Sequence, residues 1–170
     1  EFSNLIQGIG GEGLNAFTAY DVTCYMNSFP AYQMERWLTL YADRLTNPVF
    51  RSFQAELENV FEEYNMYEDN PSTHVRKTLM STIFAGHPYE RDVIGLPEHL
   101  KNPRLSKLID FYNTWYVPNN MALIIVGDFD TEATKPMIEE TFGRLEYKEL
   151  PARPTYAKTS FAGNPKHKFK

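Results

Sequence analysis

The spacing of apolar residues predicts a helix and then a pair of strands at the start of the chain. Residues 5–9 carry apolar side chains at helical spacing, and Gly10 and Gly11 then favour the end of the helix. Residues 14–30 alternate through two short runs rich in Thr, Phe, Tyr and Val. The dipeptide Tyr20-Asp21 lies between these runs, so we expect an antiparallel pair of strands joined by a tight connection.

Several segments in the middle of the chain repeat apolar residues every three or four positions, and each predicts a helix. The residues at their ends support this assignment. Asn47-Pro48 and Pro118 favour helix ends, and Ser52 and Asn70 are of the residue types that cap helix N-termini. Residues 87–102 predict a loop with one short helical turn. The predicted helices cover residues 34–45, 52–69, 74–84 and 105–117.

The last third begins with an unbroken apolar run, MALIIVGDF at 121–129, which predicts a strand that ends at Gly127-Asp128. Residues 131–145 predict a final helix. From Glu146 onward Pro, Lys, Thr and Gly dominate, which favours an extended connector toward a further segment. Because strands and helices are interleaved without a regular βαβ order, the pattern predicts an α+β fold, with an antiparallel or mixed sheet packed against helices.

The composition is that of a packed globular protein. The chain has 170 residues, 42% of them hydrophobic and 15% aromatic, which is enough for one sizeable core. A net charge of −5 gives no general attraction to nucleic acid or to anionic membranes, and no apolar run is long enough to span a bilayer. The single cysteine, Cys24, excludes an internal disulfide. The opening residues show neither an initiator methionine nor a signal peptide, so we expect an internal piece of a longer protein.

The segment ELENVFEEYNM at 56–66 holds four glutamates, and two of them lie beside the predicted buried stripe of their helix. At about 100° per residue, Glu56 and Glu63 lie within about 20° of each other on one shoulder of the stripe, and about 10 Å apart along the axis. Glu58 and Glu62 point more toward solvent. The stripe itself consists of Phe53, Leu57, Val60, Phe61 and Tyr64.

Two interpretations of the Glu56–Glu63 pair are open on this geometry. Glutamates on a helix shoulder usually reach water or pair with a lysine or arginine, and the geometry by itself favours that structural role. In the other interpretation one carboxylate binds a metal ion and the other supports the site from a distance, because one ion is not readily bound by both at this separation.

Four segments of the chain, taken together, resemble one known family. In order they are GGEGLNAFTAYDVTCY, ELENVFEEYNM, GHPYERDVIG and FYNTWYVPNNMALIIVGDFD. They resemble the insulinase/pitrilysin family of zinc metallopeptidases, which includes the mitochondrial processing peptidases. The resemblance implies a partial N-terminal peptidase domain of the insulinase/processing-peptidase type over residues 1–145. Residues 146–170 are similar to the linker between the two halves of family members.

The resemblance implies a zinc site of which this chain holds one part. Family members bind Zn²⁺ through an HxxEH helix, whose two histidines bind the ion and whose glutamate acts as general base. A third ligand lies downstream in the pattern E-x-x-x-(V/I)-x-x-E, which Glu56, Val60 and Glu63 match. The resemblance therefore implies Glu63 as a zinc ligand and Glu56 as the companion carboxylate that supports catalysis.

The HxxEH half of the site is absent from the sequence. The segment HPYER at 87–91 comes nearest, but it has Arg91 in place of the second histidine, and Pro88 disfavours the helix that would align the ligands. We therefore expect His87 to be a loop residue. The upstream HxxEH segment and the second half of the family are expected in the parent protein. The four histidines are His74, His87, His99 and His167.

The resemblance also implies a peptide-binding strand. In relatives the strand with the sequence Asn-Ala-Phe-Thr forms a sheet edge, to which the substrate peptide adds as a further strand. In this chain the matching residues are Asn15, Ala16, Phe17 and Thr18. Without the family context, the same segment is as well explained by a hairpin with a core phenylalanine.

The leading hypothesis is a fragment of a zinc metalloendopeptidase that cleaves extended peptides and is inactive as this isolated chain. The alternative is a non-catalytic structural or regulatory partner subunit of the same family, although the presence of both Glu56 and Glu63 favours an active parent. An unrelated α+β binding domain would require all four matches to be coincidence. The sequences of residues 21–25 and 33–37 are similar to those of long family members from the bacterial cell envelope, which favours a periplasmic location.

Overall fold

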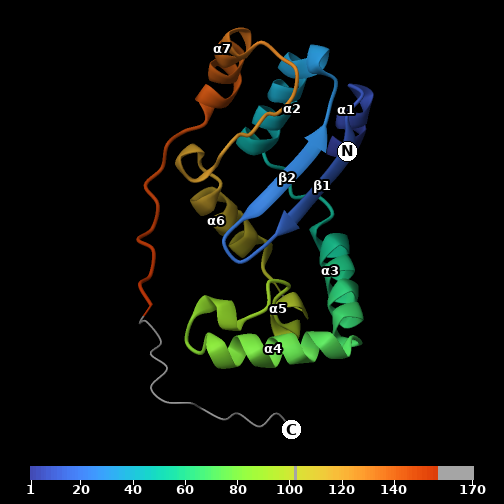
Figure 1. The fold of residues 1–170 in the computed structure, drawn as a ribbon, viewed down its shortest axis with the longest axis vertical. Coiled ribbons are helices and arrows are strands. Elements are labelled where there is room, and N and C mark those ends of the chain that lie inside the picture. The colour runs from blue at the N-terminus through green and yellow to red at the C-terminus, as the bar shows by residue number, and fades with distance from the viewer. Residues whose placement is uncertain (102, 157–170) are drawn as a thin grey trace.

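The computed structural model describes residues 1–101 and 103–156, which form two strands and seven α-helices linked by short 3-10 turns (Figure 1). The predicted connector at 146–170 is described only as far as residue 156 and has no helix or strand there. Its remainder, with His167, lies outside the described residues. The elements are α1 (Phe2–Gly8), β1 (Glu12–Thr18), β2 (Thr23–Ser28), α2 (Met34–Thr46), α3 (Phe53–Glu68), α4 (Pro71–Ile83), η2 (Pro88–Glu90), α5 (Pro97–Lys101), α6 (Leu105–Trp115) and α7 (Thr131–Thr141).

β1 and β2 form a two-stranded antiparallel hairpin, which confirms the predicted pair. Thr18 pairs with Thr23, and the Ala19 N–H donates to the Val22 carbonyl at 2.7 Å. Residues 20–21 therefore form the tip of the hairpin, as their position between the two β-prone runs predicted.

The start of β1 depends on two glycines. The register shifts between Glu12 and Asn15, and Gly13 in this irregularity has a φ of +62°, which favours glycine. At Gly11 a Cβ atom would lie 2.4 Å from Ile6 Cγ2, so a side chain there would collide with α1. These two positions explain how the chain turns sharply from α1 into the hairpin.

The buried core lies between α1, α2, α7 and the segment that precedes α7. Ile6 and Leu38 are fully buried, and half-buried side chains from α7 and the segment before it pack around them. Trp37 and Tyr41 of α2 donate to Asn27 Oδ1 at 3.0 and 2.7 Å, which fastens β2 to α2. We call α1, β1, β2, α2, α6 and α7 the hairpin lobe.

Within the hairpin lobe, α6 is attached to β2 and α2 through a cluster of tyrosines. The hydroxyl oxygens of Tyr116 and Tyr25 lie 2.7 Å apart, and the rings of Tyr112 and Tyr116 stack with centroids 4.4 Å apart. Tyr112 also donates to the Leu45 carbonyl at 2.8 Å. Burial raises the pKa of both Tyr112 and Tyr116.

α3, α4 and α5 form a second unit at the other end of the molecule, which we call the helical lobe (Figure 1). α3 packs against α4 and α5. Every residue described from 47 to 101 is half-buried or exposed, so the helical lobe has no core comparable to that of the hairpin lobe. Glu68 is the one further half-buried residue of α3, and the predicted stripe is confirmed because its five members are half-buried: Phe53, Leu57, Val60, Phe61 and Tyr64.

The helix ends differ from expectation in small ways. Asn70 caps α4 as predicted, with its side chain accepting from the Ser72 N–H at 3.0 Å. Ser52 occupies the N-cap position of α3, but its side chain makes no capping bond. Instead its backbone is left-handed, with a φ of +59°, and its carbonyl accepts the Glu56 N–H at 2.9 Å.

The strand predicted at 121–129 is wrong for this chain. The segment has no helix or strand, although Ile125 and Phe129 pack against the core. Ile124 and Val126 are 80% and 91% exposed. An apolar run favours an extended backbone, but a strand also requires a neighbouring backbone to pair with. In the described residues β1 and β2 pair only with each other.

Candidate metal and peptide sites

The two shoulder glutamates of α3 are both exposed. Glu56 lies in the first turn of the helix, and Glu63 accepts a hydrogen bond from the Tyr67 hydroxyl at 3.2 Å, one turn further on. Among the residues that the structure describes, neither carboxylate forms an ion pair with a lysine or arginine. Of the two structural roles that geometry alone favoured, the exposed side chains agree with reaching water and not with pairing to a basic residue, so both interpretations of the Glu56–Glu63 pair stay open at this point.

Glu68 on the same helix behaves differently. Its carboxylate forms an ion pair with Lys77 of α4, and this hydrogen bond is the main reason that its pKa is lowered. Of the five glutamates of α3, Glu68 thus joins two helices and the other four face solvent.

The described residues fit one part of a zinc site. A catalytic zinc in a protein takes three protein ligands and a water. No group of three histidine, cysteine, aspartate or glutamate side chains within the described ranges is arranged to hold a metal ion. Glu63 offers an exposed carboxylate, which suits zinc, but further ligands would have to come from outside the described residues.

The predicted peptide strand presents its backbone as an edge. The Ala16 N–H donates to the Asn15 Oδ1 at 2.8 Å rather than to β2. Bonded and non-bonded pairs alternate along an antiparallel ladder. Because Ala19 bonds to Val22 across the turn, the Phe17–Cys24 pair is a bonded one and the Ala16 N–H points away from β2. The side chains of residues 15–18 are all exposed, and Phe17 is 50% exposed, which does not fit a core phenylalanine.

His87 and its neighbours serve local structure, as predicted for a loop residue. His87 Nδ1 accepts the Tyr89 N–H at 3.2 Å at the start of η2. Glu90 Oε2 accepts the Gly86 N–H at 2.8 Å. His87 and Glu90 therefore hold the turn together.

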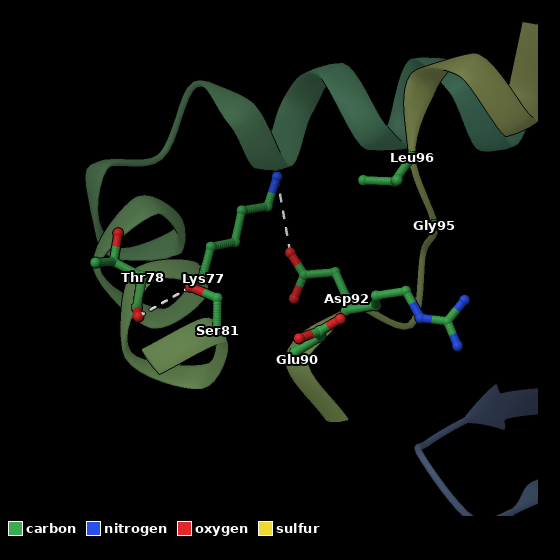
Figure 2. Close-up of a pocket in the computed structure, with 8 residues that line it drawn as sticks. Lys77, Thr78, Ser81, Glu90, Asp92, Gly95 and Leu96 are labelled. Atoms are coloured by element: carbon green, nitrogen blue, oxygen red, sulfur yellow. Dashed lines mark hydrogen bonds and ion pairs between the residues drawn. The ribbon is translucent and has the colours of Figure 1, made fainter. Parts of the chain in front are cut away.

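A shallow hollow of about 260 Å³ lies between α4 and the segment that follows η2. Figure 2 shows Lys77 and Asp92 pointing toward each other across it, with Glu90 and Ser81 nearby. Sequence analysis did not single out this cluster. The two charges lie 15 positions apart on different elements, so no short motif signals that they meet.

The two candidate sites lie on different lobes. The peptide strand belongs to the hairpin lobe and the glutamates to the helical lobe, and within the described residues no hydrogen bond joins β1 to α3. Their relative position therefore depends on how the lobes are connected.

Comparison with known families decides what the chain is. Residues 1–96 match the sequence model of the insulinase family (peptidase family M16), and residues 104–170 match that of the peptidase M16 inactive domain. The chain belongs to the insulinase family of peptidases. The family predicted from the four segments is thereby confirmed, and the α+β class is confirmed by the structures of family members. The boundary expected at residues 145–146 stays a prediction.

Individual relatives agree with the family. An uncharacterized zinc protease of Bacillus subtilis is 32% identical over 143 residues, which cover 83% of this chain and 33% of the relative. The crystal structure of a protease from Helicobacter pylori is 25% identical with a TM-score of 0.81, and the match covers 91% of this chain and 38% of that one. The Escherichia coli periplasmic protease PqqL shares the fold, with a TM-score of 0.79 at 21% identity over 93% of this chain and 18% of that one.

The chain thus spans about a third of the length of the Bacillus subtilis relative, 33%. In the described part of the chain, no helix combines the length and the apolar character needed to cross a membrane. The periplasmic location suggested by residues 21–25 and 33–37 stays a prediction.

Proposed function

We propose that this chain is the part of a zinc metalloendopeptidase that supplies one zinc ligand and the peptide-binding strand. The observation that carries the proposal is the position of Glu56 and Glu63 on one exposed shoulder of α3, at the spacing of the family's ligand pattern. Glu56 and Glu63 lie exposed and without a basic partner among the described residues, whereas Glu68 is used to join α3 to α4. The family match and the zinc proteases among the relatives support the chemistry.

Glu63 would hold the zinc ion together with ligands from an HxxEH segment outside this chain. When bound, zinc polarises a water molecule and the substrate carbonyl. Glu63 would contribute one negative charge and one oxygen ligand, and its bond from Tyr67 would orient the carboxylate. Glu56, two turns earlier on the same shoulder, would stabilise the positive charge of the site without touching the metal.

The substrate would be an extended peptide that adds to β1 as a further strand. The Ala16 N–H points away from β2 and could donate a hydrogen bond to such a peptide, because its present acceptor is only the neighbouring Asn15 side chain. Backbone pairing of this kind does not depend on the peptide's side chains, which suits an enzyme that accepts many sequences.

The metal roles are tested in the full-length protein that contains this chain, by zinc analysis after dialysis and by peptide cleavage. Glu63→Gln should lose most of its zinc and activity, since a neutral amide is a poor zinc ligand. Glu56→Gln should keep most of its zinc and lose about 10- to 100-fold in activity. Glu58→Gln is the matched control, with the same change on the solvent side of the same helix, and should match wild type.

Two results would contradict this assignment. If Glu63→Gln kept its zinc, the third ligand would lie elsewhere, and a wild-type protein without zinc would support the non-catalytic partner subunit instead. The isolated 170-residue chain should hold no stoichiometric zinc after dialysis, because Glu63 and a distant Glu56 fall short of three ligands.

A further inference from the structure

Residues 87–92 contact both lobes: the first half of the segment contacts the hairpin lobe and its last residue contacts the helical lobe. We call them the bridge segment. Tyr89, inside η2, reaches the tip of the hairpin, and Asp92 reaches α4. The zinc and peptide chemistry proposed above uses neither residue.

At the hairpin end, Tyr89 makes two contacts with the turn between β1 and β2. Its hydroxyl donates to Asp21 Oδ2, and its ring packs against Tyr20 with centroids 4.7 Å apart. The hydrogen bond to the Asp21 carboxylate raises the pKa of Tyr89, so the phenol stays protonated and able to donate. Phe84, at the end of α4, meets the same ring edge-on at 5.4 Å.

At the helical end, Asp92 is held between two basic side chains of α4. Its side chain is only 7% exposed. Asp92 Oδ1 lies 2.6 Å from Arg76 Nη2, and Asp92 Oδ2 lies 3.7 Å from Lys77 Nζ. A carboxylate this buried needs such partners, because burying a lone charge is costly. The contact thus fixes the end of the bridge segment on α4.

Lys77 carries the connection on to α3. Its ammonium pairs with Glu68 and lies 5.0 Å from the centre of the Tyr64 ring. Tyr64 directly follows Glu63 in the sequence. The chain of contacts therefore runs from the hairpin tip through the bridge segment and α4 to the turn of α3 that holds the proposed zinc ligand.

The start of α3 is attached to the hairpin lobe by weaker contacts. Phe50 meets Tyr112 edge-on with ring centroids 5.6 Å apart. Arg51 pairs with Glu1 at 3.1 Å, but their side chains are 73% and 80% exposed, and such pairs contribute little. The far end of α3 packs against α4 and α5, and the bridge segment is the part of this packing that reaches the tip of the hairpin.

We propose that the bridge segment is a strut that fixes the hairpin relative to α3, and so sets the spacing between a peptide on β1 and Glu63. Tyr89 and Asp92 are positioning residues at its two ends. The mechanical part of this inference stands on the contacts alone, and the part about spacing rests on the proposed function.

The mechanical part is tested by a distance measurement in the full-length protein. A ketone-bearing amino acid is incorporated at two exposed positions, 12 on β1 and 62 on α3, and a spin label is attached to each. The distance between the two labels is measured by double electron–electron resonance. Tyr89→Phe removes the hydroxyl that bonds Asp21 and should broaden the distance distribution. Tyr20→Phe is the matched control: it removes a hydroxyl from the adjacent ring, but that hydroxyl is buried without a hydrogen-bond partner in the described part of the chain. It should leave the distribution unchanged.

The functional part is tested by cleavage of a long peptide by the same variants. Tyr89→Phe should lower kcat by up to about 100-fold, because small misplacements of reacting groups have effects of that size. KM and zinc content should stay close to wild type, since β1 and Glu63 are untouched. Asp92→Asn should act in the same way from the other end. The double variant should cost no more in kcat than the stronger single one, because a strut released at one end is already lost.

The outcomes separate the two parts. Distances unchanged by Tyr89→Phe overturn the strut. Broadened distances with unchanged kcat overturn its role in spacing and leave the metal proposal standing, since that is tested by the zinc content of Glu63→Gln. Broadened distances with a lower kcat and retained zinc support the inference as a whole.

Discussion

The hairpin lobe and the helical lobe are stabilised in different ways. The hairpin lobe has an apolar core in which Ile6 and Leu38 have no exposed surface and Trp37 is 7% exposed. The helical lobe has no buried residue among those described from 47 to 101. It relies on half-buried stripes and on the ion pairs that join Glu68, Lys77 and Asp92.

The comparison shows which lobe is stabilised mainly by its own buried apolar side chains. Buried apolar surface stabilises by about 25 cal/mol per Å², whereas a partly buried ion pair adds little net stability, because its charges lose their hydration. The proposed peptide strand thus lies on the better stabilised lobe, and the proposed zinc ligand on the one that depends more on its neighbours.

The largest effect should come from removing core volume. Leu38→Ala should lower the free energy of unfolding by about 2–5 kcal/mol, because Leu38 is 0% exposed and its loss leaves a cavity. Leu57→Ala makes the same change at a half-buried position of α3 and should cost clearly less. Chemical denaturation followed by circular dichroism measures both. Equal losses would show that the helical lobe also has a packed core, and the comparison would fail.

A proline scan of β1 should give an intermediate effect confined to the hairpin lobe. Ala16→Pro deletes an N–H that points away from β2, which an edge strand tolerates. In the full-length protein it should raise KM for long peptides several-fold, because the peptide loses one hydrogen bond to β1. The zinc content should not change. Phe17→Pro instead deletes an N–H on the β2 side and should disrupt the hairpin itself. Cleavage of long peptides by a folded Ala16→Pro variant at the wild-type rate and KM would contradict strand addition.

The smallest effect should be a pH dependence of the helical lobe. The folded-state pKa of Glu68 is lowered, mainly by its hydrogen bond with Lys77. Its contribution to stability is therefore present above the unfolded pKa of about 4.3 and is lost as the pH falls through the lower folded value. The groups that face this carboxylate are Lys77, His74 and Tyr64.

Melting temperatures of wild type and Glu68→Gln, compared across pH, measure this contribution. Wild type should be slightly more stable at neutral pH, and the difference should shrink in acid. Glu62→Gln, at an exposed position of α3, is the control and should show no such trend. A difference that persisted unchanged well below pH 4 would show that the Glu68–Lys77 pair does not stabilise the helical lobe.

Local patterns predicted most elements. The alternating runs on either side of Tyr20-Asp21 specify the hairpin, since turn chemistry and β-prone residues act over a few positions. The stripe of α3 follows from helical periodicity, which also places Glu56 and Glu63 together on one shoulder. The segment at 121–129 was assigned to a strand on the same local evidence, and this failed because pairing requires a neighbouring backbone that its own residues do not specify.

Periodicity and motif spacing are properties of neighbouring positions, and they were enough to predict most of the elements, the family and the placement of Glu56 and Glu63 on one shoulder. Only the tertiary structure decided which carboxylate joins helices and which face solvent, and which way the Ala16 N–H points. The bridge segment was also decided there. Tyr89 meets Asp21 across 68 positions and Asp92 meets Arg76 across 16, and contacts between such distant positions arise only when the chain has folded.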